Sequence, residues 1–346
     1  MKILVTGSQG YVGTRLCEQL INTNEIELMG IDAGFYSETR LDSSIDRYHT
    51  MKKDIRDIQN EDLQHVDVVV HLAALSNDPL GEFNSDLTNE INYLATVTLA
   101  QLAKKNGCRK FIFLSTQSVY GISKLQTPVT EDGPTNPQTE YARTKLKAEK
   151  AIMELNSDNF QVYVLRPATV FGYSSRFRSD IVFNNLLASA YFKGSIEILS
   201  DGTPWRPVLF IDDLVNVICY IIDSNDATIS GFPINVGLPG TNLQVKDIAA
   251  AAQKCCPSAT IKYSDKSSRD ERSYQVDFSL LSSLFPSNII PRTTLEQGGQ
   301  AMLSKWIELK LGLEEFISSK TIRLAKLKEL QEKGAIDSQL RFSTEL

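Results

Sequence analysis

Apolar runs alternate with mixed polar stretches along the first half of the chain. The runs from Lys2 to Thr6, Ile26 to Ile31 and Val66 to His71 have the length and apolar content of buried strands. The stretches from Leu87 to Asn106 and Thr139 to Leu155 carry helix-forming residues with apolar side chains at helical spacing. Because strands and helices alternate, the pattern predicts an α/β fold with a doubly wound parallel sheet and right-handed crossovers.

The second half breaks this alternation. Pro, Gly, Asn and Ser interrupt the stretch from Phe232 to Leu243, and a helix is predicted from Val245 to Cys255. One amphipathic helix is predicted from Leu313 to Glu332, ended by Gly334 and packed on its own subunit or on a partner.

These patterns predict two domains. Residues 1–173 form the first, and later elements near 208–237 return to it. Residues 174–346 form mainly a smaller C-terminal α/β substrate domain and the C-terminal helix.

Composition narrows the function classes. The 346 residues carry a net charge of −6, which argues against a nucleic-acid-binding surface, and 42% are hydrophobic, as in ordinary globular proteins. The five cysteines lack metal-ligand spacing and there are only three histidines, so we predict reduced thiols in the cytoplasm and no metal site. No apolar run approaches the ~18 residues of a membrane span, and the N-terminus enters a strand rather than a signal peptide.

A glycine-rich turn follows the first predicted strand and precedes a helix that runs to about Asn22. Its residues are Gly7, Gly10, Tyr11, Val12 and Gly13. Glycines in this position let the backbone approach a pyrophosphate, which binds at the helix N-terminus. Asp32 ends the second strand, where a carboxylate accepts hydrogen bonds from a ribose 2′-OH and repels a 2′-phosphate. The turn and Asp32 together predict NAD rather than NADP.

Two further segments extend this dinucleotide site. Asp54 and Ile55 are predicted to flank the adenine. Leu72, Ala73 and Ala74 follow the next strand, and small residues there let the backbone pass close to the cofactor.

A candidate proton-transfer site lies between Leu114 and Lys145. The apolar run from Phe111 to Leu114 ends in hydroxyl side chains, among them Thr116. On the following helix Tyr141 and Lys145 are four residues apart, so they share one face. An ammonium beside a phenol favours the phenolate. A Tyr-x-x-x-Lys spacing alone is a weak signal, and it gains meaning from the dinucleotide site that precedes it.

Taken together, the chain resembles the extended short-chain dehydrogenase/reductase family, specifically its nucleotide-sugar epimerase and dehydratase members. The residues that carry the resemblance are Gly7, Gly10, Gly13, Asp32, Asp54, Ala73, Ala74, Asn92, Thr116, Tyr141, Lys145 and the segments 165–172 and 201–206. The resemblance runs from residue 1 to about 312. It implies a Rossmann sheet, an NAD cofactor and a nucleotide-diphosphate sugar as substrate.

The resemblance also implies a site. Its cofactor-binding members beyond those above are Ser115 and Pro167, with Tyr141 and Lys145 shared with catalysis. Its substrate-binding members are Ser76, Asn77, Gln117, Ser118, Arg176, Arg178, Asn184, Arg206 and Arg272. In family members the arginine at the position of Arg206 holds the phosphates of the sugar nucleotide.

Three arginines leave alternatives open. Arg176 and Arg178 are substrate-loop cations or belong to a solvated basic turn. Arg272 contacts a phosphate or ribose, or pairs with the neighbouring Asp270 or Glu271.

The predicted reaction is a hydride transfer between NAD and a sugar carbon, C4 being favoured. Tyr141 is the acid/base, Thr116 orients the sugar oxygen and Lys145 acts on Tyr141 and the nicotinamide ribose. Dehydratases of the family have Asp-Glu where this chain has Gln117 and Ser118, so elimination of water lacks an acid and a base.

Epimerase, dehydrogenase and ketoreductase remain open, as do the sugar and the nucleotide. A segment resembling relatives of GDP-heptose 4-dehydrogenases adds to the resemblance to UDP-glucose 4-epimerase. A non-catalytic NAD-binding scaffold is the alternative of another class. Family members also pair two subunits through two helices, so we expect a homodimer in which Leu94, Val97 and Leu146 meet the partner.

Overall fold

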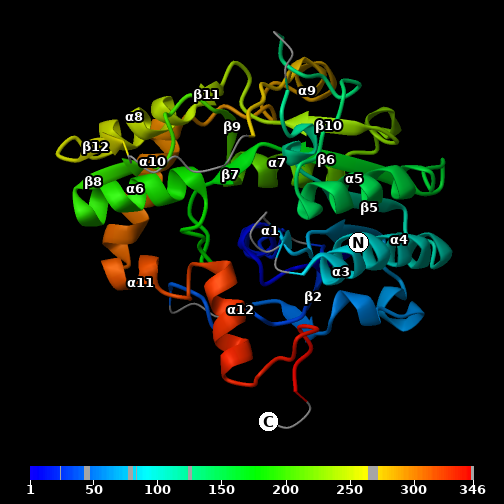
Figure 1. The fold of residues 1–346 in the computed structure, drawn as a ribbon. Helices are drawn as coiled ribbons and strands as arrows, with labels where there is room; N and C mark the ends of the chain where they lie inside the picture. Colours follow the sequence, from blue (N-terminus) through cyan, green and yellow to red (C-terminus); the bar gives the residue numbers. More distant parts are fainter. Residues whose placement is uncertain are drawn as a thin grey trace.

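A seven-stranded sheet forms the centre of the molecule (Figure 1). The computed structural model describes residues 1–23, 25–42, 47–76, 81–82, 84–123, 127–263 and 272–343. The strand order is β10-β6-β5-β4-β1-β2-β3, and all neighbouring pairs are parallel. The strands are β1 (Lys2–Thr6), β2 (Glu27–Asp32), β3 (His49–Lys52), β4 (Val68–His71), β5 (Lys110–Leu114), β6 (Gln161–Pro167) and β10 (Pro233–Val236). The predicted fold class is confirmed.

Helices cover both faces of this sheet because successive strand residues point to opposite sides. On one side, Leu4 of β1 packs in the core formed with α3 (Ser85–Asn89), α4 (Ala95–Lys105) and α5 (Glu140–Met153). On the other side, Ile3 and Val5 pack in the core formed with α1 (Tyr11–Leu20), α7 (Ile211–Asp223) and α9 (Ser279–Leu284). A double-sided cover leaves the strand ends as the accessible edge of the sheet.

A second core lies in the later part of the chain around Trp306 and Phe183. Its helices are α6 (Val182–Lys193), α8 (Val245–Cys255), α10 (Leu295–Glu308) and α11 (Leu313–Ile317). Two small sheets accompany it, one of β7 (Thr169–Phe171), β9 (Trp205–Phe210) and β11 (Asn242–Gln244), the other of β8 (Ser195–Ile198) and β12 (Thr260–Tyr263). The helix predicted from Val245 to Cys255 is confirmed.

Two predicted helices differ from the structure. The helix predicted from Leu87 to Asn106 contains a π-helical turn, Glu90–Leu94, between α3 and α4. The helix predicted from Leu313 to Glu332 is wrong as a single element, because α11 ends at Ile317 and α12 (Arg323–Glu332) begins a new direction. Between them the hydroxyl of Thr321 donates to the carbonyl oxygens of Glu315 and Phe316, so side-chain bonds replace the helical ladder there.

The C-terminal helix returns to the first half of the molecule. Leu327 of α12 is fully buried in the core that contains the central sheet. Figure 1 shows α12 in red beside the blue ribbon of β2. This segment therefore packs on its own subunit.

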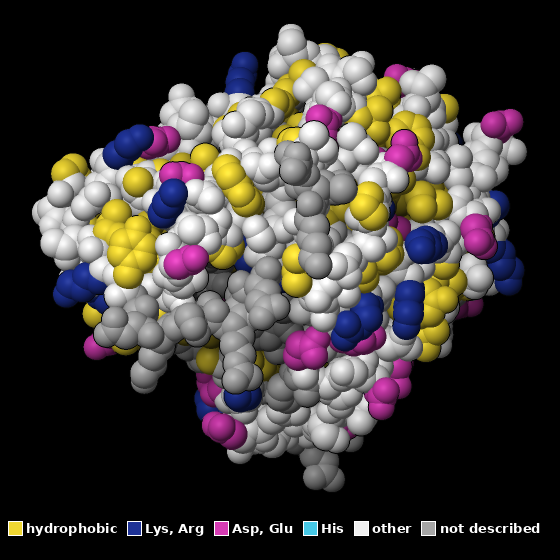
Figure 2. All heavy atoms as spheres, turned by 45° about the horizontal axis from the view of Figure 1, so that its top comes forward, with side chains coloured by type: hydrophobic (Ala, Val, Ile, Leu, Met, Phe, Trp, Pro, Cys, Tyr) yellow, Lys and Arg dark blue, Asp and Glu magenta, His cyan; other side chains and the backbone are white. Residues whose placement is uncertain are grey.

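Charges of both signs are interspersed on the surface shown in Figure 2, without a single-sign stripe. None of the helices in the described residues is long and apolar enough to span a bilayer.

Candidate active site

A cavity of about 900 Å³ opens at the carboxyl ends of the central strands and extends to the second core. Twenty-one predicted site residues line it: Gly7, Gly10, Tyr11, Val12, Gly13, Asp32, Asp54, Ile55, Leu72, Ala73, Ala74, Ser76, Ser115, Thr116, Ser118, Tyr141, Lys145, Pro167, Arg178, Arg206 and Arg272. The sequence pattern thus brings together residues from across the chain at the strand ends, where α/β proteins bind ligands.

The glycine turn requires glycine for steric reasons. Gly7 has φ +71°, and a Cβ on it would lie 2.7 Å from the backbone nitrogen of Ala73. A Cβ on Gly13 would lie 2.0 Å from the carbonyl oxygen of Gly7. Gly10 caps α1 without any side-chain hydrogen bond, so the helix N-terminus faces the cavity as an anion site. These close approaches fit a dinucleotide pyrophosphate.

Asp32 is tied to this turn. Its carboxylate accepts hydrogen bonds from the backbone N–H of Gln9, at 3.0 Å, and of Gly34, at 2.8 Å. Burial raises the pKa of Asp32, and the two backbone bonds oppose that rise. Asp32 therefore stands at the end of β2 in position to accept from a ribose hydroxyl, as NAD requires.

Asp54 is also held in place before any ligand binds. Arg56 donates to it from its backbone N–H, at 2.8 Å, and from its guanidinium, at 2.7 and 3.0 Å. Burial opposes ionisation, but the bonds from Arg56 hold the pKa of Asp54 below its ordinary value. Asp54 therefore stays a carboxylate and orients the adjacent Ile55 toward the cavity.

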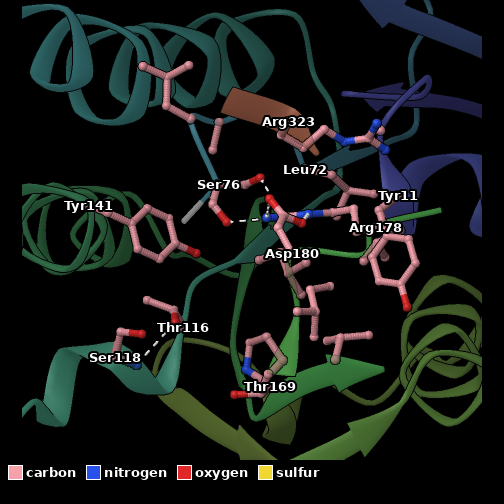
Figure 3. Close-up of a pocket in the computed structure, with 18 of the residues that line it drawn as sticks. Tyr11, Leu72, Ser76, Thr116, Ser118, Tyr141, Thr169, Arg178, Asp180 and Arg323 are labelled. Atoms are coloured by element: carbon pink, nitrogen blue, oxygen red, sulfur yellow. Dashed lines mark hydrogen bonds and ion pairs between the residues drawn. The ribbon is translucent and has the colours of Figure 1, made fainter. Parts of the chain in front are cut away.

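The candidate catalytic residues lie at the other end of the cavity. Figure 3 shows the Tyr141 hydroxyl pointing into the space above Thr116. Thr139 caps α5 by accepting from the N–H of Ala142, and this fixes the helix start just before Tyr141. The Thr116 hydroxyl oxygen accepts from the N–H of Ser118 at 3.1 Å, and Thr116 lines the cavity.

Lys145 lies beneath Tyr141 on the same helix face. Its Nζ donates to the carbonyl oxygen of Leu114 at 2.8 Å and lies 4.5 Å from the ring centre of Phe113. Burial lowers the pKa of Lys145 to about 7, and the charge of Glu149 opposes that shift. The Lys145 ammonium therefore lies at the floor of the cavity, where little water solvates it.

A buried polar network behind Lys145 was not predicted. Glu149 is fully buried, pairs with Arg166 at 2.6 Å and accepts a very short bond from the hydroxyl of Ser115. Arg166 also donates to the Tyr120 hydroxyl at 3.0 Å. The available signal was spacing, because Glu149 follows Lys145 at the interval that separates Lys145 from Tyr141.

Four predicted site residues in the described part of the chain do not line the cavity, and two of them hold segments that do. Asn92 is fully buried in the π-helical turn and exchanges hydrogen bonds with the N–H and carbonyl of Leu75. Asn184 accepts from the N–H of Gly172 and donates to the carbonyl of Arg178. Both hold cavity-lining loops rather than a ligand.

The other two are Gln117 and Arg176. Gln117 is 1% exposed and its amide points to the carbonyl oxygens of Arg166 and Val236. Arg176 is 1% exposed and donates to the carbonyl oxygens of Tyr36 and Ser37 and to Thr14. Neither contacts the cavity, so substrate binding by their side chains is not supported.

The alternative of a solvated basic turn is wrong as well. Arg178 is 7% exposed, pairs with Asp180 at 2.8 Å and donates to the Ser76 hydroxyl at 3.2 Å. Figure 3 shows this group in the middle of the cavity. Arg206 donates to the carbonyl oxygens of Trp205 and Arg272 in the far wall. Asn77, Asp270 and Glu271 lie outside the described residues.

No group of three or more His, Cys, Asp or Glu side chains in the described ranges is arranged to hold a metal ion. The cavity instead brings together the glycine turn, the Asp32 carboxylate and the Tyr141–Lys145 pair.

Comparison with known proteins identifies the family. The sequence profile of the NAD dependent epimerase/dehydratase family matches residues 3–237. The chain belongs to this family. The resemblance noted in the sequence and the prediction of an NAD cofactor are thereby confirmed.

Individual relatives are distant in sequence. The uncharacterized UDP-glucose epimerase YtcB of Bacillus subtilis is 27% identical over 315 residues, which cover 86% of this chain and 95% of that protein. UDP-glucuronic acid decarboxylase 1 of Arabidopsis thaliana is 26% identical over 312 residues, covering 88% of this chain and 69% of that protein.

Among solved structures, UDP-glucuronic acid 4-epimerase of Bacillus cereus, in complex with UDP-glucuronic acid and NAD, superposes with a TM-score of 0.74 and 29% identity. The match covers 89% of this chain and 100% of the Bacillus cereus chain, so this chain carries residues that the other lacks.

Proposed function

We propose that this protein is an NAD-dependent enzyme that oxidises or reduces C4 of a nucleotide-diphosphate sugar. The observation that carries the proposal is the position of Tyr141 and Thr116 in one cavity with the dinucleotide cradle around Gly7 and Asp32. Relatives named for UDP-sugars support a nucleotide sugar as the second ligand.

The residues divide the work as follows. Tyr141 takes the proton of the sugar hydroxyl or returns it to the ketone, and Thr116 holds the same oxygen by a hydrogen bond. The Lys145 ammonium favours the phenolate form of Tyr141 by its charge. When bound, NAD accepts or supplies the hydride, and the protein contributes position and electrostatics.

Loss of water from the sugar has little support. Gln117 is turned away from the cavity, and Ser118 offers only a hydroxyl. Asp180 is the cavity carboxylate in the middle of Figure 3, but Arg178 outweighs the effect of burial and holds its pKa below the ordinary value. Asp180 is therefore ionised near neutral pH and is a poor acid.

Product mass tests the proposal. The purified enzyme is incubated with NAD and each of a panel of UDP-, GDP-, TDP- and CDP-sugars. An epimer of unchanged mass without net NADH indicates an epimerase, whereas a product two hydrogens lighter with one NADH indicates a dehydrogenase. A keto sugar reduced with NADH shows the reverse reaction. A product lighter by one water would contradict the assignment of Tyr141 as the acid/base acting without a second acid.

The same panel tests the non-catalytic alternative. A protein that binds NAD, shows no absorbance change at the reduced-nicotinamide band and returns every sugar nucleotide unaltered, with no epimer formed, would favour a scaffold. The presence of both Tyr141 and Lys145 in the cavity favours an enzyme.

We also propose a homodimer formed through α4 and α5. Leu94, just before α4, is 49% exposed, which is unusual for a large apolar side chain and suits a partner contact. Light scattering at micromolar concentration should show twice the monomer mass, and Leu94→Glu should shift it toward monomer.

A further inference from the structure

The C-terminal segment, residues 318–343, closes one side of the cavity. It is anchored to the first half of the chain by Arg341, which pairs with Asp57, and by the ring of Phe342, which stacks on Phe35 at 5.6 Å. The guanidinium of Arg56 donates to the carbonyl oxygen of Gln339 at 2.9 Å. Asp57 and Phe35 neighbour Asp54 and Asp32, so the segment is fixed beside the predicted adenosine end.

The start of α12 forms part of the cavity wall itself. Ile322, Arg323 and Leu324 line the same cavity as the glycine turn and Asp32. Figure 3 shows Arg323 across the cavity from Tyr141 and Thr116, on the side of Leu72 and Tyr11. The sequence pattern of this helix gave no sign of a role in the site.

Arg323 is a buried cation whose bonds all go to uncharged groups. It is 2% exposed, its guanidinium donates to the Thr39 hydroxyl at 3.3 Å and to the carbonyl of Arg176 at 2.6 Å, and it lies over the ring of Tyr36 at 4.4 Å. Among the described residues Arg323 forms no salt bridge, and the charge of Asp180 acts on its guanidinium only from beyond ion-pair distance. By contrast, Arg178 in the same wall is paired with Asp180.

An unpaired buried charge is unfavourable, and a guanidinium has five N–H donors, of which neutral acceptors here take two. Burial accordingly lowers the pKa of Arg323 to about 10. A ligand anion in the cavity would supply the missing opposite charge and accept the remaining donors. Charge-assisted bonds from arginine to phosphate oxygens are among the strong hydrogen bonds in proteins.

We propose that Arg323 binds the ADP half of NAD, and that the C-terminal segment is thus part of the cofactor site. The negative charge of the pyrophosphate compensates the guanidinium, which is already positioned by Thr39 and the Arg176 carbonyl. The sequence motifs that carry the family resemblance all lie before about residue 312, so Arg323 is not one of them. The proposal does not depend on which sugar the enzyme uses.

The experiment compares three full-length variants. Arg323→Gln retains an amide donor for Thr39 or the Arg176 carbonyl but removes the charge, Arg323→Lys retains the charge, and Lys328→Met removes an exposed cation from the same helix as a control. Calorimetric titration measures the Kd for NAD, ADP-ribose and UDP, and the rise in melting temperature on adding NAD is recorded.

We expect Arg323→Gln to weaken NAD and ADP-ribose equally, by about tenfold or more, which is the range for one charge-assisted hydrogen bond. Arg323→Lys should recover part of the loss, and Lys328→Met should change nothing. UDP binding should stay unchanged in all three variants, because UDP has no adenosine and so should not occupy the part of the cavity next to Arg323.

Wild-type affinity of Arg323→Gln for ADP-ribose would overturn the proposal. The proposal would also be overturned if NAD raised the melting temperature of Arg323→Gln as much as that of the wild type. If the apo variant melted at a lower temperature but responded normally to NAD, the role of Arg323 would be purely structural. Since none of these readouts involves turnover, the result is independent of the proposed sugar chemistry.

Discussion

The two ends of the cavity are built in different ways. At the Tyr141 end, the polar side chains come from β5 and α5, which are neighbours in the sequence, and Lys145 sits there as a buried ammonium bonded to a carbonyl. From the middle of the cavity toward Asp32, Arg178 and Arg323 come from segments far apart in the chain and are fixed by Asp180, Thr39 and backbone. Local spacing therefore places the Tyr141–Lys145 pair, whereas long-range packing places the two arginines.

The largest expected effect tests the Tyr141 end of the cavity. Tyr141→Phe keeps the ring but removes the transferable proton, so turnover should fall by about 10²- to 10⁴-fold while the Kd for NAD stays within about twofold. Steady-state rates and calorimetric titration measure the two quantities. Thr116→Val is the matched comparison and should lose less, because it removes one hydrogen bond and no proton route.

A large loss of NAD affinity in Tyr141→Phe would break the comparison, because it would mean that the two ends are not independent.

A smaller effect is expected at the Asp32 end of the cavity, on the choice between NAD and NADP. NAD should bind at least about tenfold more tightly than NADP, because the 2′-phosphate would meet the Asp32 carboxylate at close range. Asp32→Ala should narrow that ratio and leave turnover at saturating NAD near the wild-type rate. Direct titration with both cofactors measures it, and equal affinities in the wild type would show that Asp32 does not face the 2′ position.

The smallest expected effect concerns the buried charge of Lys145 at the Tyr141 end of the cavity. The pKa of Lys145 is about 7 in the folded protein against an ordinary value of 10.5. The native state therefore binds fewer protons than the unfolded chain between these values, and stability rises with pH across that window. The buried ammonium is most unfavourable below about pH 7. Lys145→Met should raise the apo melting temperature by several degrees near about pH 6, and the gain should shrink toward about pH 10.

Lys147→Met is the control, because Lys147 is exposed on the same helix. If the increase in melting temperature caused by Lys145→Met grew with pH, its sign would be opposite to the one expected, and it would contradict the burial of a charged Lys145.

Much of the first half was predictable because its signals are local. The strand Lys2–Thr6 and the shared face of Tyr141 and Lys145 follow from short-range periodicity, and the structure places both as expected. Gly7 and Gly13 were recognisable because only glycine permits their close approaches.

The sequence predictions that failed share one physical cause. A basic stretch such as the one around Arg176 is indistinguishable from a solvated turn until the carbonyls of Tyr36 and Ser37 from another segment are brought to it. Likewise the amphipathic pattern after Leu313 continues through Thr321, whose hydroxyl bonds end one helix and force the next to turn. Both outcomes are decided by partners that no local window contains.

The position of α12 has a consequence for the order in which the site can assemble. The Gly7 turn and Asp32 are made well before Arg323, so one wall of the cavity requires a contact of very long sequence separation. Contacts of this kind form late, because the closure entropy of the intervening chain must be overcome first. A growing chain can thus complete its central sheet before α12 is available to close this side of the cavity.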